Sequence, residues 1–543
     1  MKRLRLLLLT AILLGCPTVQ GSMGQGQQDQ SNTPTFRATS TLVFLDITVL
    51  DKKGRPVVTR LTKDDFTITE DNKPQRIFSF EAPETHVMGA NAGDSDPGGK
   101  APVTVFVLDL LNSSFEDFAY MRYEVGQFLM SQPPQLTSPA ELMVIGNKSL
   151  DMLQGYTRNR ADLMYALHHL PATLPWKKMN ASSWELFDQS MNALQLIALQ
   201  NKGVPGRKNI IWVGHGGPSL YLGVVQGASA KLEEELKQYV HTTTNMLVDA
   251  RISLFVIYPG LSGGLQHLGP GGRVQQPGFY SSAQMSAYAE IGDEDPFAGD
   301  INFGVFVNET GGKLFYNRND LDTVIKQSEV IGSEYYTLTY QPQDVEPDGK
   351  FRRIRVTLRD RNLRAVTKAG YFAPDTNLPI DVQQQKMAKL AEAVQSAIPF
   401  NALDVRLSDV VRHPDSQTAE FTVQLKSKNV TFLATEDDKN SANLILAAAS
   451  LNKDRRFLAT RIHTLTLLTQ DMRPLPDVVS SFQLTIPIPR KTRSVRVVIE
   501  NEDGGRIGTA DLDRKAIDAA PATPTDEPQL TTRPEHATPP QRQ

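Results

Sequence analysis

Cysteine is almost absent from this 543-residue sequence, which contains one, and neither sign of charge is in clear excess. A single thiol excludes an intramolecular disulfide, so an exported form must be stabilised by packed cores and not by covalent cross-links. The formal net charge is -3, with 57 Lys and Arg against 60 Asp and Glu. No basic stripe stands out, and we therefore expect no nucleic acid among the partners. The length and apolar content favour several domains with substantial cores.

The first 21 residues, MKRLRLLLLTAILLGCPTVQG, have the form of a signal peptide. Basic residues precede an apolar run, residues 6–14, that is too short to span a bilayer comfortably. This pattern predicts an exported protein that is periplasmic, anchored to the outer membrane or extracellular. Cys16 ends the segment LLGC, which resembles the lipobox where bacterial lipoproteins are cleaved and acylated. The alternative is an ordinary secretory signal that is cleaved near Gly21. The only membrane contact that we expect is a lipid on Cys16, if the lipobox is used.

Changes in composition and periodicity divide the chain into segments. Alternating strands separated by turn residues, a strand-helix alternation and a late group of closely spaced strands each predict a different architecture. The predicted order is a signal peptide (1–21), a flexible tether (22–35), a small β domain (36–85), a linker (86–101), an α/β domain (102–332), an antiparallel β extension (333–375), a linking helix (376–398), a β-sandwich domain (399–515) and a disordered tail (516–543).

The middle of the chain alternates buried strands with amphipathic helices. The segment VTVFVLDL (103–110) is a nearly continuous apolar run, which is typical of a central parallel strand buried on both faces. The alternation predicts an α/β fold with a doubly wound, mostly parallel sheet flanked by helices. Binding sites in such sheets lie beyond the carboxyl ends of the strands. Asp109 falls at such an end, directly before the small polar residues of LNSS.

An ordered series of segments carries a resemblance to a known family: VTVFVLDLLNSS, GRKNIIWVGHGG, ISLFVIYPG, VNETGGKLFYN and DGKFRRIRVTLRD. In this order they resemble the von Willebrand factor A (VWFA)-related domain proteins of bacteria, of the acidobacterial type. The resemblance covers roughly residues 40–375. It implies a VWFA/Rossmann-like α/β domain whose better-studied relatives bind protein ligands through a metal-ion-dependent adhesion site (MIDAS).

The first strand of that family carries the motif D-x-S-x-S. Matched residue by residue, Asp109 and Ser113 agree with the motif, but Leu111 stands at the first serine position. Asn112 and Ser114 are the neighbouring oxygen-bearing residues that would substitute if the loop shifted by one position. The alternative role for Asp109 is to cap the following helix or to bind loop amides.

The remaining family ligands are a threonine before the third-helix region and an aspartate after a later strand. Trp184 stands at the threonine position, beside Ser183, and His215 stands at the aspartate position. Loss of a carboxylate removes both charge and a ligand from a magnesium site, whereas a histidine suits a softer metal such as zinc. The resemblance therefore implies a degenerate MIDAS, with Mg²⁺ or another divalent cation as the cofactor to consider and none certain.

Basic residues recur along the segment KFRRIRVTLRD. Arg352, Arg353, Arg355 and Arg359 occupy mostly alternate positions. This spacing predicts the solvated face of a strand, and the alternative is a patch that binds an anionic ligand.

We interpret the sequence as an exported binding or scaffolding protein and not as an enzyme. The leading hypothesis is protein-protein interaction or adhesion at the cell envelope, through loops at the carboxyl end of the α/β sheet. Genuine divalent-metal-dependent adhesion centred on Asp109 is the first alternative. An envelope hydrolase is the second, and it is disfavoured because no nucleophile, base and orienting group occur together.

Overall fold

The computed structural model describes most of the chain from Leu42 to Ala522. The predicted signal peptide, Cys16 and the predicted tether lie outside the described residues. Within the described part, no helix is both long and apolar enough to cross a membrane. The described ranges are 42–58, 61–88, 100–146, 149–170, 183–218, 220–221, 230–259, 267–268, 274–275, 295–297, 300–343, 346–375, 382–435, 439–469 and 478–522.

A six-stranded sheet forms the centre of the α/β region, in the order β14-β10-β8-β5-β6-β7. Neighbouring strands are parallel except for the β6–β7 pair, which is antiparallel. The strands are β5 (Val103–Asp109), β6 (Gln135–Ile145), β7 (Leu150–Asn159), β8 (Lys208–Val213), β10 (Ile252–Pro259) and β14 (Lys313–Arg318). The predicted mostly parallel α/β sheet is confirmed, and the sequence interpretation did not identify β7.

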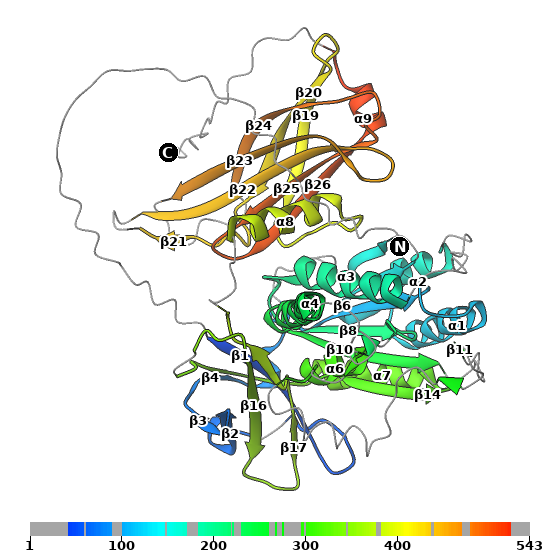
Figure 1. Cartoon of the computed structure of the whole chain (residues 1–543), viewed down its shortest axis with the longest axis vertical. Coiled ribbons are helices and arrows are strands. Elements are labelled where there is room, and N and C mark those ends of the chain that lie inside the picture. The colour runs from blue at the N-terminus through cyan, green and yellow to red at the C-terminus, as the bar shows by residue number, and fades with distance from the viewer. Residues whose placement is uncertain are drawn as a thin grey trace, which may run out of the picture. The chain divides into compact units, whose positions relative to one another are not determined.

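Helices cover both faces of this sheet (Figure 1). One hydrophobic cluster joins α1, α2 and α7 to one face, and a second joins α3, α4 and α6 to the other. The helices are α1 (Phe115–Ser131), α2 (Arg160–His168), α3 (Ser183–Asn201), α4 (Ala230–Asp249), α6 (Phe303–Glu309) and α7 (Leu321–Ser333). Burial on both faces explains why β5, β8 and β10 consist almost entirely of buried side chains.

The first helix shows how local sequence sets an element. Ser114 is its N-cap, and the Ser114 hydroxyl accepts a hydrogen bond from the Asp117 amide. Phe118, Met121 and Val125 then recur at helical spacing and are buried. This cap begins α1 within a few residues of Asp109, so the polar loop at the end of β5 is short.

The two β segments that flank the α/β region along the chain pair with each other. The first contributes β1 (Val43–Leu50), β2 (Phe66–Glu70), β3 (Lys73–Gln75) and β4 (Ile77–Glu81), with 3-10 turns η1 (Lys63–Asp65) and η2 (Pro83–Thr85). The second contributes β15 (Tyr336–Tyr340), β16 (Phe351–Leu358), β17 (Arg364–Val366) and β18 (Gly370–Phe372). They form two four-stranded sheets, β17-β1-β15-β4 and β18-β16-β2-β3. The predicted β domain and β extension therefore share their sheets.

The C-terminal region follows helix α8 (Val382–Gln395) and contains two antiparallel sheets. Side chains from both sheets line one hydrophobic cluster. The strands are β19 (Val405–His413), β20 (Thr418–Lys426), β21 (Leu433–Ala434), β22 (Asn440–Leu451), β23 (Phe457–Thr469), β24 (Val479–Pro487), β25 (Ser494–Asn501) and β26 (Arg506–Asp513), followed by helix α9 (Arg514–Ala519). The β-sandwich assignment stays a prediction.

Two short strand pairs complete the described elements. Strand β9 (Leu220–Tyr221) pairs with β13 (Asp300–Ile301), and β11 (His267–Leu268) pairs with β12 (Val274–Gln275).

Candidate functional site

The candidate site lies at the carboxyl edge of the six-stranded sheet, between β5 and β8. These two strands are neighbours, but the chain leaves β5 toward β6 on one side and reaches β8 on the other only after α3. This is the point where the strand order reverses, and open α/β sheets bind ligands at such points. The loop of residues 110–114 follows β5, and Gly214, His215 and Gly216 follow β8.

Asp109 is fully buried at this edge and its carboxylate is surrounded by hydrogen-bond donors. Oδ1 accepts from the Asn112 amide at 2.9 Å and from Asn112 Nδ2 at 3.2 Å. Oδ2 accepts from Trp212 Nε1 at 3.1 Å, from the Gly216 amide at 2.8 Å and from Asn112 Nδ2 at 3.2 Å. A carboxylate offers about four lone-pair sites, so Asp109 is saturated by the protein itself. It binds loop amides, whereas Ser114 caps the helix.

Two glycines allow the β8 loop to approach Asp109. Gly214 has φ of 140°, and a Cβ there would lie 2.3 Å from the Cβ of Asp109. Gly216 has φ of 67°, and its amide is one of the donors to Asp109. Any larger residue at Gly214 would displace the buried carboxylate, so the GHGG sequence is explained by close packing against Asp109.

Among the residues that the structure describes, none forms an ion pair with Asp109. Burial raises the pKa of Asp109 above its ordinary value, and the hydrogen bonds from Asn112 and Trp212 oppose that rise without cancelling it. His215 also acts against the rise at longer range. The local field at this edge therefore favours the neutral carboxyl more than water does.

A second buried carboxylate, Asp117, lies on the first turn of α1. Its Oδ2 accepts from the Ser114 hydroxyl at 2.8 Å and lies 3.4 Å from His215 Nε2. The sequence interpretation missed Asp117 as a site residue. The spacing Ser114-x-x-Asp117, a capping-box pattern, was the available signal.

Three buried oxygens near this loop have no hydrogen-bond partner among the described residues: Asn112 Oδ1, Ser113 Oγ and Asp117 Oδ1. Two of them are neutral, and Asp117 already accepts from Ser114. Magnesium requires about six oxygens in octahedral geometry, with carboxylates supplying charge. Asp109 has no lone pair left for such an ion, and the described residues contain no group of three His, Cys, Asp or Glu that could hold a metal. The residues present therefore do not fit a magnesium site built on Asp109.

The third helix reaches the site through a residue that the sequence interpretation did not select. Helix α3 begins at Ser183, whose side chain lies outside the described part, and the Trp184 side chain is 42% exposed. Asn112 Nδ2 instead donates to Ser190 Oγ at 3.1 Å. Ser190 is two turns into α3, and no local pattern distinguishes it from the other polar residues of that helix.

Aromatic side chains are exposed on elements that begin or end at this edge. Phe115 at the start of α1 is 61% exposed, and Tyr316 on β14 is 38% exposed. The ring of Tyr316 lies 5.1 Å from that of Tyr258, which in turn lies 5.5 Å from the imidazole of His215. Together with Trp184, these side chains give the edge an aromatic character.

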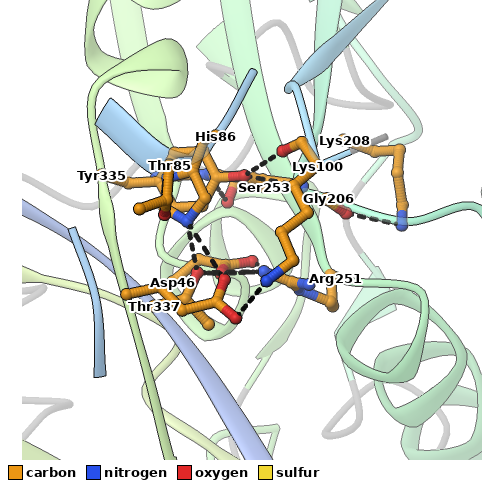
Figure 2. Close-up of polar contacts among 12 residues, drawn as sticks. Asp46, Thr85, His86, Lys100, Gly206, Lys208, Arg251, Ser253, Tyr335 and Thr337 are labelled. Carbon is orange, nitrogen blue, oxygen red and sulfur yellow. Dashed lines mark hydrogen bonds and ion pairs between the residues drawn. The ribbon is translucent and has the colours of Figure 1, made fainter. Parts of the chain in front are cut away.

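The opposite, amino edge of the sheet holds a different aspartate, Asp46 of β1, whose side chain is only 9% exposed (Figure 2). Arg251 directly precedes β10, and its Nε donates to Asp46 Oδ2 at 3.0 Å while its Nη2 contacts Asp46 Oδ1. The Thr337 hydroxyl donates to the same carboxylate at 2.8 Å. Burial alone would raise the pKa of Asp46, but the Arg251 guanidinium outweighs it and holds the pKa below its ordinary value. This pair joins the β1–β15 sheet to the α/β sheet.

Further polar contacts surround that pair. The His86 ring stacks on the ring of Tyr335 at 4.0 Å, and burial lowers the pKa of His86. Arg207 Nη1 donates to Thr48 Oγ1 at 2.8 Å, and Lys208 Nζ donates to the Gly206 carbonyl at 2.9 Å. Every contact in this group is made within the fold, which indicates a structural role.

Comparisons with known proteins add little to this geometry. No family model matches the chain, and no curated protein does. Among solved structures, the SpRpn10 VWA domain is 18% identical over 31% of this chain and 79% of its own, with a TM-score of 0.18. The human COPII-coat protein Sec24c is 10% identical over 54% of this chain and 47% of its own, with a TM-score of 0.24. At these TM-scores, neither likeness adds to what the strand order shows about the fold.

Proposed function

We propose that this chain is an exported cell-envelope protein whose VWFA-like domain binds a protein partner, without a metal, through loops at the carboxyl edge of its six-stranded sheet. The leader-like N-terminus supports export. The family resemblance of the sequence and the reversal of strand order between β5 and β8 support the choice of edge. In this proposal the family's adhesion site is degenerate.

The exposed aromatic side chains at the edge carry this proposal. Phe115, Trp184 and Tyr316 are each more than a third exposed. Aromatic residues are enriched at protein interfaces and among the residues that dominate binding energy. The saturated carboxylate of Asp109 supports the same conclusion, because it orders the neighbouring loops before any partner arrives and so lowers the entropic cost of binding.

The side chains at this edge do not support the hydrolase alternative. The Ser114 hydroxyl donates to Asp117, and His215 contacts the same Asp117 oxygen. The carboxylate, and not the imidazole, is therefore next to the hydroxyl, whereas an activated serine needs a base beside it. Ser113 Oγ has no hydrogen-bond partner among the described residues.

Site-specific photo-crosslinking tests the proposed interface. A photoreactive phenylalanine analogue replaces Phe115 or Trp184 in the full chain, and Phe78 of β4, which is 70% exposed, is the matched control. Each protein is irradiated in an envelope extract of the source cells, with EDTA or with added magnesium. We expect the same crosslinked partner from positions 115 and 184, none from position 78, and equal yields in EDTA and magnesium.

Other outcomes contradict the proposal in distinct ways. Equal crosslinking from position 78 would mean that exposed aromatics are captured without regard to the edge. A partner that is captured only with magnesium would favour metal-dependent adhesion through Asp109. Turnover of an envelope ester or peptide that is lost in Ser114→Ala would favour the hydrolase.

A further inference from the structure

A basic pocket lies outside the α/β region, between β16 and the turn that joins β2 to β3. Its volume is about 360 Å³, which is within the range of small-ligand sites. We call this site the β16 pocket. The charged and aromatic side chains of its lining are Asp71, Lys350, Phe351, Arg352, Arg353 and Arg355. Four cations and one carboxylate give the pocket a positive field.

The backbone that shapes the β16 pocket is held in place. Asp71 and Asn72 have φ of 48° and 63°, as the tight turn between β2 and β3 requires. The Asp71 amide donates to the Arg353 carbonyl, and Asp71 Oδ1 accepts from the Arg353 amide, each at 2.9 Å. These reciprocal bonds fix the turn against β16, so the floor of the pocket is formed before a ligand binds.

The basic side chains of the β16 pocket differ in exposure and in the partners that they contact. Arg352 is mostly buried, and its Nη2 donates to Asp348 Oδ1 and to the Glu346 carbonyl, both at 2.7 Å. Arg353 lies over the Phe351 ring at 5.6 Å, a contact that orients its guanidinium. The Arg355 side chain is exposed and has no hydrogen bond or ion pair to any residue that the structure describes, and the Lys350 side chain is also exposed.

From this arrangement we propose that the β16 pocket binds a phosphate-bearing anion, with Lys350 and Arg355 as its direct ligands. Arg352 forms ion pairs with Asp348 at 2.7 Å and with Asp71 at 4.0 Å, and it positions the segment before β16. Lys350 and Arg355 are the exposed cations of the lining and are available to an external anion. An arginine guanidinium matches phosphate oxygens in a bidentate geometry, and the lysine ammonium adds a point charge. Thr69, which pairs across the sheet with Arg355, places a hydroxyl in the same lining.

The source of the phosphate is either a soluble phosphate compound or the headgroup of an anionic lipid. Two probes separate these sources: pyrophosphate, titrated into the full chain by calorimetry, and phosphatidylglycerol vesicles, tested by co-sedimentation. The pocket variant is Lys350→Gln/Arg355→Gln. The matched control is Arg361→Gln/Arg364→Gln, which removes the same charge from two exposed residues outside the lining.

We expect the pocket variant to weaken binding of at least one probe by about tenfold or more, since charge-assisted hydrogen bonds are lost. We expect the control variant to change the affinity for the same probe by less than about threefold, because distant surface charges are screened by salt. Pyrophosphate binding with this pattern assigns a soluble source, and vesicle binding with this pattern assigns a headgroup.

One more variant gives a result of opposite sign. Asp71→Asn keeps the Oδ1 acceptor for the Arg353 amide and removes the only carboxylate of the lining. We expect it to tighten binding about twofold to fivefold, because repulsion of the anion is removed. Absence of binding to both probes, or equal losses in the pocket and control variants, would overturn the proposal.

Discussion

Each of the two edges of the six-stranded sheet holds an aspartate that is largely removed from solvent, and the two are stabilised differently. Asp46 at the amino edge faces the Arg251 guanidinium, and its pKa lies below the ordinary value. Asp109 at the carboxyl edge is surrounded by amides and an indole, and its pKa lies above the ordinary value. A neighbouring cation fully offsets the free-energy cost of burying a charged carboxylate, whereas neutral hydrogen-bond donors offset only part of that cost.

This difference separates an edge that joins two sheets of the protein from the edge that we propose for binding. Asp46 and Arg251 neutralise each other's charge, and their ion pair joins two sheets. At the carboxyl edge, the hydrogen-bond donors of the loops bind Asp109, and aromatic side chains around it stay exposed. The comparison predicts that the amino edge is the more sensitive of the two to substitution.

The largest effect should follow removal of the Asp46 carboxylate. Asp46→Ala leaves the largely enclosed Arg251 guanidinium without its counter-charge, and we expect the free energy of unfolding to fall by about 3 kcal/mol. Denaturant titration measures this change. Asp320→Ala is the control, because Asp320 and Arg318 form a half-exposed pair at 2.6 Å, which should be worth less than about 1 kcal/mol. Similar losses in the two variants would show that the amino-edge pair is not special.

A smaller effect should follow a change at Asp109. Asp109→Asn keeps the shape but turns one acceptor into a donor that faces other donors, and we expect a loss of about 1–3 kcal/mol in the same titration. Asp151→Asn, an exposed change on β7 of the same sheet, should alter the stability by less than about 0.5 kcal/mol. A loss at Asp109 larger than that at Asp46 would reverse the comparison.

Glu141 on β6 extends the comparison to another buried carboxylate that forms no ion pair with a described residue. Burial raises the pKa of Glu141 to about 8, and a hydrogen bond from Gln200 only partly opposes this. The folded chain therefore binds more protons than the unfolded chain between pH 4.5 and 8, so the contribution of Glu141 to stability falls as the pH rises through that window.

Glu141→Gln removes this titration. We expect the variant to exceed the wild type in stability by about 4 kcal/mol at pH 9, because each unit of the pKa rise from 4.5 to about 8 is worth about 1.4 kcal/mol. At pH 4.5 the advantage should vanish, because the wild-type carboxyl is then protonated in the folded state. Thermal or denaturant unfolding of both proteins at the two pH values measures the difference. An advantage that is equal at both pH values would mean that packing, and not ionisation, causes it.

Local patterns in the sequence were enough to place the central elements. The segment VTVFVLDL, predicted as a buried central strand, contains β5, because a continuous apolar run is a local property of the sequence. The pairing of β1 with β15 joins residues almost 300 positions apart, and no local pattern encodes such a register. The antiparallel edge strand β7 lacks a clear alternation of buried and exposed residues, so its pattern gave little signal.

The position of Asp109 at the end of a strand was predictable, but its hydrogen-bond partners were not. Asp109 was identified because it ends a buried strand. Trp212 and Ser190 come from β8 and α3, and only the folded chain shows that one donates to Asp109 and the other accepts from Asn112. Asp117 was overlooked because an acidic residue in a first helical turn usually favours the helix dipole without further role.

The central claim is that the carboxyl edge is complete without a metal, and calorimetric titration of the full chain with magnesium, manganese and calcium tests it most directly. We predict no saturable heat with any of the three ions, and no rise in the unfolding temperature of the wild type or of Asp109→Asn. Saturable heat and a higher unfolding temperature in the wild type, both lost in Asp109→Asn, would contradict the claim and identify Asp109 as a metal ligand.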